Sequence, residues 1–331
     1  MSGLERVLVT GGAGMIGSNL VKRLVQNGFD VSVIDNLWRG KREYLLDETG
    51  MSVIDMESKF HKIDLSSHMN IDSIIAEVDY VFHLADVVAG VDYVFDNQGS
   101  VFRQNLLINS NLIAAVRRNP VKGFIYVGTA CSFPANLQTG VDARPLKEED
   151  QYPAFPESSY GWSKLMGEYE AFLMEEETGI PVSVLTLHNV YGTPCDFGLE
   201  KSQVIPSLVR KAIEYPKNDF VVWGSGEQGR AFVHVDDVVD ALTLAMQKGF
   251  GKGLIQIGPD FCTPIKEIAA LIKDISGKDM PIFFDTSKPE GDRGRCANYS
   301  KAKKILGWEP RVDLWEGLTS LYRWIEARVT A

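Results

Sequence analysis

The stretch Thr10-Gly11-Gly12-Ala13-Gly14-Met15-Ile16-Gly17 (residues 10–17) has glycines at every third position from Gly11. It follows an apolar run at 7–9 and opens a helical pattern over 14–27. Small residues are needed where a strand turns tightly into a helix and where a pyrophosphate approaches the backbone N–H groups. The helix N-terminus adds partial positive charge at that point. The stretch therefore predicts a strand–turn–helix unit that binds a pyrophosphate group.

An acidic residue ends the next predicted strand. Asp35 follows the apolar run 31–34 and lies 18 residues beyond the last glycine of the loop. A carboxylate at this place accepts hydrogen bonds from ribose hydroxyls and repels a 2′-phosphate. Loop, spacing and acid together predict NAD as the cofactor, in preference to NADP. Arg39, Lys41 and Arg42 follow closely and would weaken that preference.

Apolar runs and helical patterns alternate through the first half of the chain. Further buried strands are predicted at 80–82, 124–127 and 182–187, and helices at 100–118 and 158–178. This alternation is typical of a doubly wound parallel α/β sheet, which binds ligands at the carboxyl ends of its strands.

The second half is less regular and is punctuated by prolines. We expect a smaller, interleaved C-terminal α/β domain formed by 188–230 and 263–331. The Rossmann-type NAD-binding domain would then comprise 1–187, with 231–262 returning to it. Helices are predicted at 203–214, 235–248, 264–276, 300–307 and 314–328.

Composition excludes several classes of protein. The 331-residue chain is 45% hydrophobic, as globular proteins are, and its formal net charge of −10 gives no general basic surface for nucleic acid. The four cysteines form no C-x-x-C pair and the five histidines show no metal-ligand spacing, so we expect no metal site and a reducing compartment. The sequence has no signal-peptide pattern and no apolar run of about 18 residues, which favours a cytoplasmic protein without a membrane partner.

Tyr160 and Lys164 stand at positions i and i+4 of the predicted helix 158–178 and so share one helix face. A neighbouring ammonium favours the phenolate and lowers the pKa of the tyrosine from about 10. Such a tyrosine can act as a base toward a sugar hydroxyl while a hydride leaves for a nicotinamide. Thr129, at the end of a predicted strand, offers a hydroxyl to the same substrate oxygen. Cys131 lies two residues on and is expected on the same side of an extended backbone.

These motifs together resemble the extended short-chain dehydrogenase/reductase superfamily, in its nucleotide-sugar branch. The resemblance runs along nearly the whole chain and includes the turn 188–192 and the closing motif 301–310. It implies a nucleotide-sugar substrate whose diphosphate is neutralised by arginines, and a homodimer formed through helices 100–118 and 158–178. The cofactor-binding residues that it implies are Gly11, Gly14, Met15, Ile16, Gly17, Asp35, Asn36, Asp64, Leu65, Leu84, Ala85, Tyr160 and Lys164. The substrate-binding residues that it implies are Asn105, Asn189, Lys201, Val204, Arg230 and Arg293, with Arg295 competing for the role of Arg293.

The turn after the strand 124–127 narrows the choice of reaction within this family. The 4,6-dehydratases carry a Thr-Asp-Glu run there, whereas this chain has Thr129-Ala130-Cys131 without an acid. The simple 4-epimerases place Ser or Thr where Cys131 stands. A cysteine followed by Pro134 resembles the GDP-mannose 3,5-epimerase and GDP-fucose synthase branches, where the thiol is an acid/base beside a transient ketone. The resemblance favours an NAD-dependent GDP-sugar epimerase in which Cys131 acts at C5 or C3.

Three alternatives stay open. If Cys131 is a small apolar packing residue, the chain fits a UDP-sugar 4-epimerase. A nucleotide-sugar dehydratase of unusual regiochemistry is the second alternative, and a catalytically silent nucleotide-binding regulator is the third. The partner acid/base is also open, because Gln203 stands where GDP-fucose synthases have a histidine. Lys201 matches either the second acid/base or a noncatalytic lysine of the 3,5-epimerases.

Overall fold

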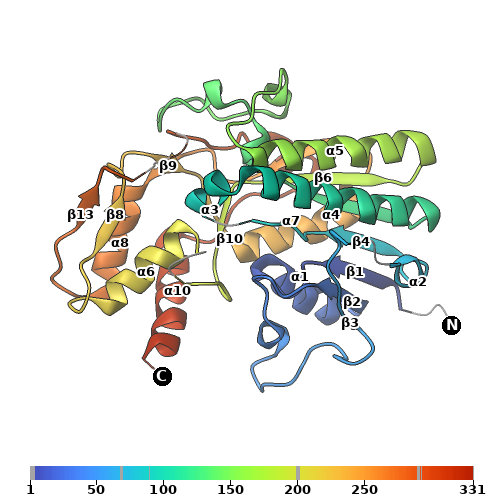
Figure 1. The fold of residues 1–331 in the computed structure, drawn as a ribbon, viewed down its shortest axis with the longest axis horizontal. Coiled ribbons are helices and arrows are strands. Elements are labelled where there is room, and N and C mark those ends of the chain that lie inside the picture. The colour runs from blue at the N-terminus through green and yellow to red at the C-terminus, as the bar shows by residue number, and fades with distance from the viewer. Residues whose placement is uncertain are drawn as a thin grey trace.

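A seven-stranded parallel sheet forms the centre of the computed structural model (Figure 1). The structure describes residues 4–67, 70–88, 90–198, 202–288, 291 and 293–330, apart from the side chains of residues 91 and 92. The strand order is β11-β6-β5-β4-β1-β2-β3, and neighbouring strands pair in parallel throughout. The strands are β1 (Arg6–Thr10), β2 (Asp30–Asp35), β3 (Phe60–Lys62), β4 (Tyr80–His83), β5 (Gly123–Thr129), β6 (Val182–Leu187) and β11 (Leu254–Ile257).

Helices cover both faces of this sheet (Figure 1). Alternate residues of a strand point to opposite faces, so β1 sends Val7 and Val9 into one hydrophobic core and Leu8 into the other. Because both cores are apolar, the strands appear in the sequence as continuous hydrophobic runs. The helices over the Leu8 face are α4 (Gln98–Arg118) and α5 (Ser159–Thr178), which run side by side, and those over the Val9 face are α1 (Met15–Gln26) and α7 (Val235–Lys248).

The sheet has its topological switch point between β1 and β4. From β1 the chain passes outward through β2 and β3, then returns to β4 and continues through β5, β6 and β11 on the other side. Leu84 N donates to Thr10 O at 3.2 Å, so the turns that follow β1 and β4 lie against each other. Ligands of doubly wound sheets bind in the crevice at this point. The fold class predicted from the sequence is confirmed.

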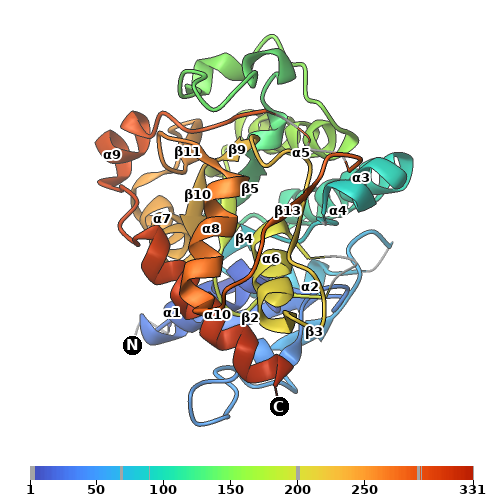
Figure 2. The same ribbon diagram turned by 90° about the vertical axis from the view of Figure 1, so that its left-hand side faces the viewer.

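A smaller group of elements packs next to the sheet and has its own core (Figure 2). Its three long helices contact one another and bury Leu208, Ile268 and Leu321 between them. These helices are α6 (Val204–Glu214), α8 (Ile265–Ser276) and α10 (Leu314–Val329). Short strand pairs join them, namely β7 (Asn189–Tyr191) with β10 (Phe232–His234), β8 (Val221–Trp223) with β13 (Phe283–Asp285), and β9 (Gly229–Arg230) with β12 (Thr263–Pro264).

One C-terminal helix lies with the sheet and not with this smaller group. α9 (Ser300–Leu306) packs against α7 and β11, and Leu306 and Trp308 belong to the core of the sheet domain. Residues 300–308 therefore lie with the sheet, although their positions fall within 263–331. The chain also contains α2 (Asp72–Ile75) and α3 (Val91–Asp96).

The predicted long helices agree with the observed ones to within two residues at each end. The sequence patterns do not predict β3 and β11, which have only three and four residues and thus carry little periodic signal. Within the described ranges, no helix has the length and apolar character that a membrane span requires.

Glu168 lies in the interior of α5, where its charge opposes folding. The side chain is 2% exposed and accepts a hydrogen bond from Gln151 Nε2 at 3.2 Å. Burial raises the pKa of Glu168 from 4.5 to about 7, although the Gln151 bond and the Lys164 charge act in the opposite direction. Since the unfolded chain ionises at the lower pKa, the folded protein loses stability as the pH rises from 4.5 to about 7.

We expect Glu168→Gln to remove this pH dependence. The free energy of unfolding of the parent should fall by about 2–3 kcal/mol relative to that of the variant as the pH rises through this window. Chemical denaturation at a series of pH values measures the difference. Glu176→Gln, on the exposed side of α5, is the matched control and should follow the parent. Parallel pH profiles for the parent and Glu168→Gln would contradict the effect of burial.

Candidate active site

A cavity of about 520 Å³ opens at the carboxyl edge of the sheet, between the sheet and the smaller group of elements. Its volume is within the range of small-molecule and cofactor sites. Three sets of residues predicted from the sequence border it. Those expected for the cofactor are Gly11, Gly14, Met15, Ile16, Gly17, Asp35, Asn36, Asp64, Leu65, Leu84 and Ala85; those expected for catalysis are Thr129, Cys131, Tyr160 and Lys164; and those expected for the substrate are Asn189, Val204 and Arg230.

The glycine loop allows backbone to approach backbone at the floor of the cavity. Gly11 has φ of +69°, and a Cβ there would stand 2.9 Å from Ala85 N. A Cβ on Gly17 would stand 2.2 Å from Gly11 O, which leaves no room for any side chain. α1 begins at Met15, so its first N–H groups border the cavity. This arrangement fits a pyrophosphate at the helix N-terminus.

The loop also orients the carboxylate of Asp35. Ala13 N donates to Oδ2 at 3.0 Å and Leu37 N donates to Oδ1 at 2.7 Å. Burial raises the pKa of Asp35, and these two backbone hydrogen bonds oppose the rise. The carboxylate therefore has a fixed position on the cavity wall, where it can accept hydrogen bonds from ribose hydroxyls. These residues fit a bound NAD, whose pyrophosphate and adenosine ribose they would hold.

Arg39 places a cation on the same wall. Its Nη1 donates to Val88 O at 2.6 Å and its Nε lies 3.9 Å from Asp196 Oδ2. The side chain is thus tied to the segment after β4 and to the smaller group of elements. Arg39 therefore lies near the residues expected to bind the cofactor. From the sequence it was expected only to weaken the preference for NAD over NADP.

The catalytic residues converge because α5 begins directly against the turn that follows β5. Ser158 caps α5 by accepting a hydrogen bond from Gly161 N at 3.2 Å. A Cβ on Gly161 would stand 2.1 Å from Cys131 O, so backbone packs on backbone at this junction. Thr129 ends β5, and its hydroxyl acts to lower the pKa of the Tyr160 side chain, against the effect of burial. Thr129 and Tyr160 therefore both border the cavity.

The turn itself differs from the prediction. Ala130–Ser132 forms a 3₁₀ turn and not an extended segment. Thr129 caps it, because its Oγ1 accepts a hydrogen bond from Cys131 N at 3.3 Å. The expectation that Cys131 shares a side with Thr129 through an extended backbone was therefore wrong. Cys131 nevertheless borders the cavity.

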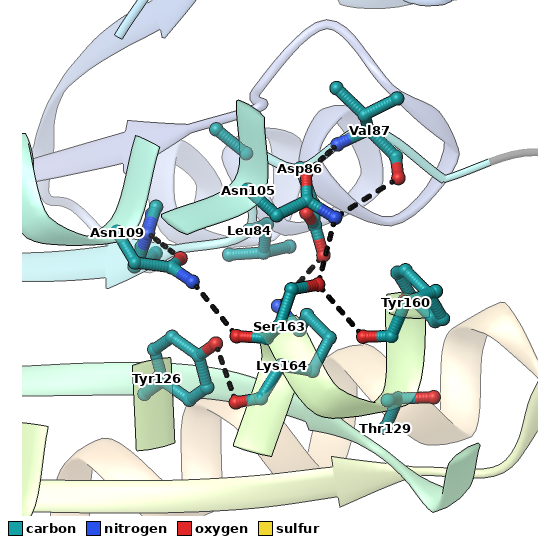
Figure 3. A network of polar contacts seen from close by, with 12 residues as sticks. Leu84, Asp86, Val87, Asn105, Asn109, Tyr126, Thr129, Tyr160, Ser163 and Lys164 are labelled. Carbon is teal, nitrogen blue, oxygen red and sulfur yellow. Dashed lines mark hydrogen bonds and ion pairs between the residues drawn. The ribbon is translucent and has the colours of Figure 1, made fainter. Parts of the chain in front are cut away.

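The second correction concerns Lys164. Its Nζ lies 3.1 Å from Asp86 Oδ2, and it stands over the Tyr126 ring, 4.6 Å from the centroid (Figure 3). Burial raises the pKa of Tyr160 well above its usual value, and the Asp86 and Cys131 charges add to the rise. The Thr129 hydrogen bond and Arg295 oppose it. The predicted lowering of the Tyr160 pKa was therefore wrong for this structure, because burial outweighs any effect of the nearby lysine.

Asn105 is a buried support and does not border the cavity. Its Oδ1 accepts a hydrogen bond from Val87 N at 2.8 Å, and its Nδ2 donates to Ser163 Oγ at 3.2 Å (Figure 3). Ser163 Oγ in turn donates to Tyr160 O at 2.8 Å. The predicted contact between Asn105 and the substrate is not supported. The amide instead joins the segment after β4 to the first turn of α5.

Two arginines border the substrate side of the cavity. Arg230 and Arg295 are both buried, and Arg295 Nη1 donates to Gln138 Oε1 at 2.9 Å. Arg293, which the resemblance implied, is exposed and does not border the cavity. Arg295 therefore takes the position that was expected for Arg293. Lys201 lies outside the described residues.

A family model described as the NAD dependent epimerase/dehydratase family matches residues 7–258. The chain belongs to this family. Membership agrees with the resemblance in the sequence and makes NAD the cofactor of this member. It also agrees with the glycine loop and the Asp35 carboxylate described above.

Relatives within the family include enzymes of both GDP- and UDP-sugars. GDP-mannose 3,5-epimerase 1 of Oryza sativa subsp. indica is 31% identical over 328 residues, which cover 98% of this chain and 82% of the relative. The structure of UDP-glucose 4-epimerase of Thermotoga maritima with UDP-glucose has a TM-score of 0.87 at 30% identity, covering 98% and 99% of the two chains. The UDP-glucose 4-epimerase of Thermus thermophilus in complex with NAD has a TM-score of 0.80 at 25% identity, covering 96% and 98%.

We expect Gly17→Ala to weaken NAD binding by at least about tenfold, because the added methyl group would overlap Gly11 O and open the pyrophosphate site. Isothermal titration calorimetry of the parent and variant measures the effect. Gly99→Ala is the matched control, since a Cβ at this glycine of α4 meets nothing within 4 Å. An unchanged affinity in a folded Gly17→Ala protein would contradict the assignment of the loop.

Proposed function

We propose that this member of the family is an NAD-dependent epimerase of a GDP-sugar, which acts through a transient 4-keto sugar with Cys131 as acid/base at C5 or C3. The main observation in favour of this proposal is that Cys131 lies at the same cavity as the expected catalytic residues. The residue is tied to Thr129 by its backbone N–H and borders the same cavity as Tyr160. The relation to GDP-mannose 3,5-epimerase over almost the whole chain supports the choice of substrate class.

In the proposed reaction, Tyr160 acts at C4 of the sugar and Cys131 acts at the neighbouring carbon, C3 or C5. Tyr160, which borders the cavity beside Thr129, takes the proton of the C4 hydroxyl. NAD, held by the glycine loop and Asp35, would supply reversible hydride transfer at C4. The ketone at C4 makes the hydrogens at C3 and C5 acidic, and the Cys131 side chain takes one of them. A proton then returns on the opposite face of that carbon, and Lys201 is the candidate that the sequence offers for its donor.

The two buried arginines account for the binding of an anion by an acidic protein. Guanidinium groups form bidentate hydrogen bonds with phosphate oxygens. We assign the sugar diphosphate to Arg230 and Arg295, which border the cavity, in place of Arg293. Asn189 and Val204 border the same cavity and remain proposed substrate contacts.

A UDP-sugar 4-epimerase is the second candidate, favoured by the similarity to the Thermotoga maritima enzyme. In that case Thr129 and Tyr160 are the catalytic residues at C4, and Cys131 is a small packing residue without an acid/base role. A dehydratase is less well supported, because Ala130 stands where the 4,6-dehydratases have an acid. A silent regulator is disfavoured because Thr129, Tyr160 and Lys164 all border the cavity.

The assembly and the compartment remain proposals. We propose a homodimer through α4 and α5, where Trp162 and Tyr169 are exposed large side chains on α5. We also keep the cytoplasm as the predicted compartment.

Incubation in D₂O tests the proposed function directly. The enzyme with NAD is given GDP-mannose, UDP-glucose or UDP-N-acetylglucosamine separately, and the sugars are followed by proton NMR and mass spectrometry. We expect deuterium at C3 or C5 of the GDP-sugar with no net redox change. A C4 epimer without deuterium would establish the second candidate instead, and loss of water would establish a dehydratase.

We expect Cys131→Ser to reduce deuterium exchange by about 10²-fold or more, because a serine hydroxyl is a far weaker acid than a thiol. Transient reduction of NAD, seen by its absorbance, should persist because Tyr160 and Thr129 still act at C4. Tyr160→Phe is the complementary control and should stop both signals while NAD still binds. Exchange at the parental rate in Cys131→Ser would show that the thiol only packs.

A further inference from the structure

Residues 193–198, which we call the strap, follow β7 of the smaller group of elements. Cys195 and Asp196 of the strap border the same cavity as Asp35 and the glycine loop. The strap forms neither a helix nor a strand. Its position against the NAD-binding side of the cavity therefore depends on its contacts with neighbouring elements.

The first of these contacts is with α1. Asn19 Nδ2 donates to Thr193 O at 2.9 Å. The same nitrogen donates to Met15 O at 2.8 Å, and Met15 is the first residue of α1. The strap thus begins beside the helix N-terminus to which the pyrophosphate of NAD is assigned.

Two further contacts continue along the residues expected to bind the cofactor. The Tyr44 hydroxyl, from the 3₁₀ turn Arg42–Leu45, donates to Cys195 O at 3.0 Å. Tyr44 and Cys195 are each only 4% exposed, so this hydrogen bond is shielded from water. Arg39 Nε lies 3.9 Å from Asp196 Oδ2, and the Asp196 charge acts against the effect of burial on the pKa of Arg39.

Aromatic packing adds to the polar contacts. The Phe197 ring of the strap meets Trp324 of α10 edge to face, with centroids 5.9 Å apart. The Tyr44 ring meets the same tryptophan edge to face at 6.4 Å. One side chain of the smaller group therefore packs against both the strap and the turn that holds it.

We propose that the strap is a gate that sets the rate at which NAD enters and leaves, and that Asn19, Tyr44 and Arg39 hold it closed. The inference uses NAD, the cofactor of the family, and does not depend on the identity of the sugar. The holding contacts join protein groups only. Loosening them therefore makes opening easier in both directions, whereas the affinity for NAD depends on the free and bound states and changes little.

A gated cofactor fits one class of reaction better than another. An enzyme that catalyses a net oxidation exchanges its cofactor in every turnover, so a closed strap would limit its rate. A reaction without net redox change regenerates NAD within the site and needs no exchange. The strap therefore favours an isomerase or a redox-neutral lyase over a net dehydrogenase.

Tyr44→Phe tests the gate, because it removes the hydroxyl that bonds Cys195 O and keeps the ring. We expect NAD to dissociate about five- to tenfold faster and to associate faster by a similar factor, so that the Kd changes by less than about twofold. Dissociation is measured by chasing labelled NAD from the loaded protein with unlabelled NAD. Association is measured by stopped-flow tryptophan fluorescence. Asn19→Ala, which removes the contact with Thr193 O, should act in the same direction.

Tyr80→Phe is the matched control. Its hydroxyl lies 3.5 Å from Glu5 in an exposed contact, and Tyr80 does not border the cavity. Both rates should stay at the parental values in this variant. Gly17→Ala gives the opposite pattern, since it is expected to weaken affinity through the pyrophosphate site itself.

Parental exchange rates in folded Tyr44→Phe and Asn19→Ala proteins would overturn the inference. Faster dissociation without faster association would also overturn it, because that result indicates lost cofactor contacts and not a gate. A lower melting temperature with unchanged exchange would show that the Tyr44 hydroxyl is structural only. If Tyr44→Phe does not fold, Asn19→Ala supplies the same two rates. Because no sugar is added, a wrong assignment of the substrate would leave the result unaffected.

Discussion

The carbonyl oxygen of Cys131 lies so close to Gly161 that a Cβ on the glycine would stand 2.1 Å from it. This contact fixes the start of α5 against the turn after β5. Thr129 and Cys131 come from one side of the contact, and Tyr160 and Lys164 come from the other. The parallel order of the sheet places β4 next to β5 and brings Asp86 to the same place. The chemistry of the site therefore depends on a backbone contact that only glycine permits.

Positive and negative side chains border different parts of the cavity, although the net charge of the whole chain is negative. The protein carries a formal charge of −10, yet Arg230 and Arg295 border the side assigned to the sugar diphosphate. Asp35 borders the side assigned to the adenosine ribose. Asp86 and Lys164, 3.1 Å apart, border the same cavity. Local charges of opposite sign thus match a ligand pair with phosphates in two places and a reacting sugar between them.

The sequence predicted those features whose cause is local. The glycine loop, the acid at the end of β2 and the long helices depend on spacing and periodicity, and the structure agrees with them. The 3₁₀ turn at Ala130–Ser132 escaped prediction because it depends on capping by the Thr129 side chain. The partner of Lys164 escaped because Asp86 lies far from it in sequence and meets it only through the pairing of β4 with β5. Arg293 and Arg295 are too close in sequence for spacing to decide which of them faces the cavity.

In the proposed reaction, Cys131 reaches a carbon next to the C4 position at which Tyr160 acts. A crystal structure of the Tyr160→Phe protein with NAD and GDP-mannose tests it most directly. The account predicts the C4 hydroxyl within hydrogen-bond distance of Thr129 Oγ1, and C5 or C3 about 3–3.5 Å from Cys131 Sγ. A sugar whose C3 and C5 both lie beyond about 5 Å from the sulfur, with the thiol packed among apolar side chains, would contradict it.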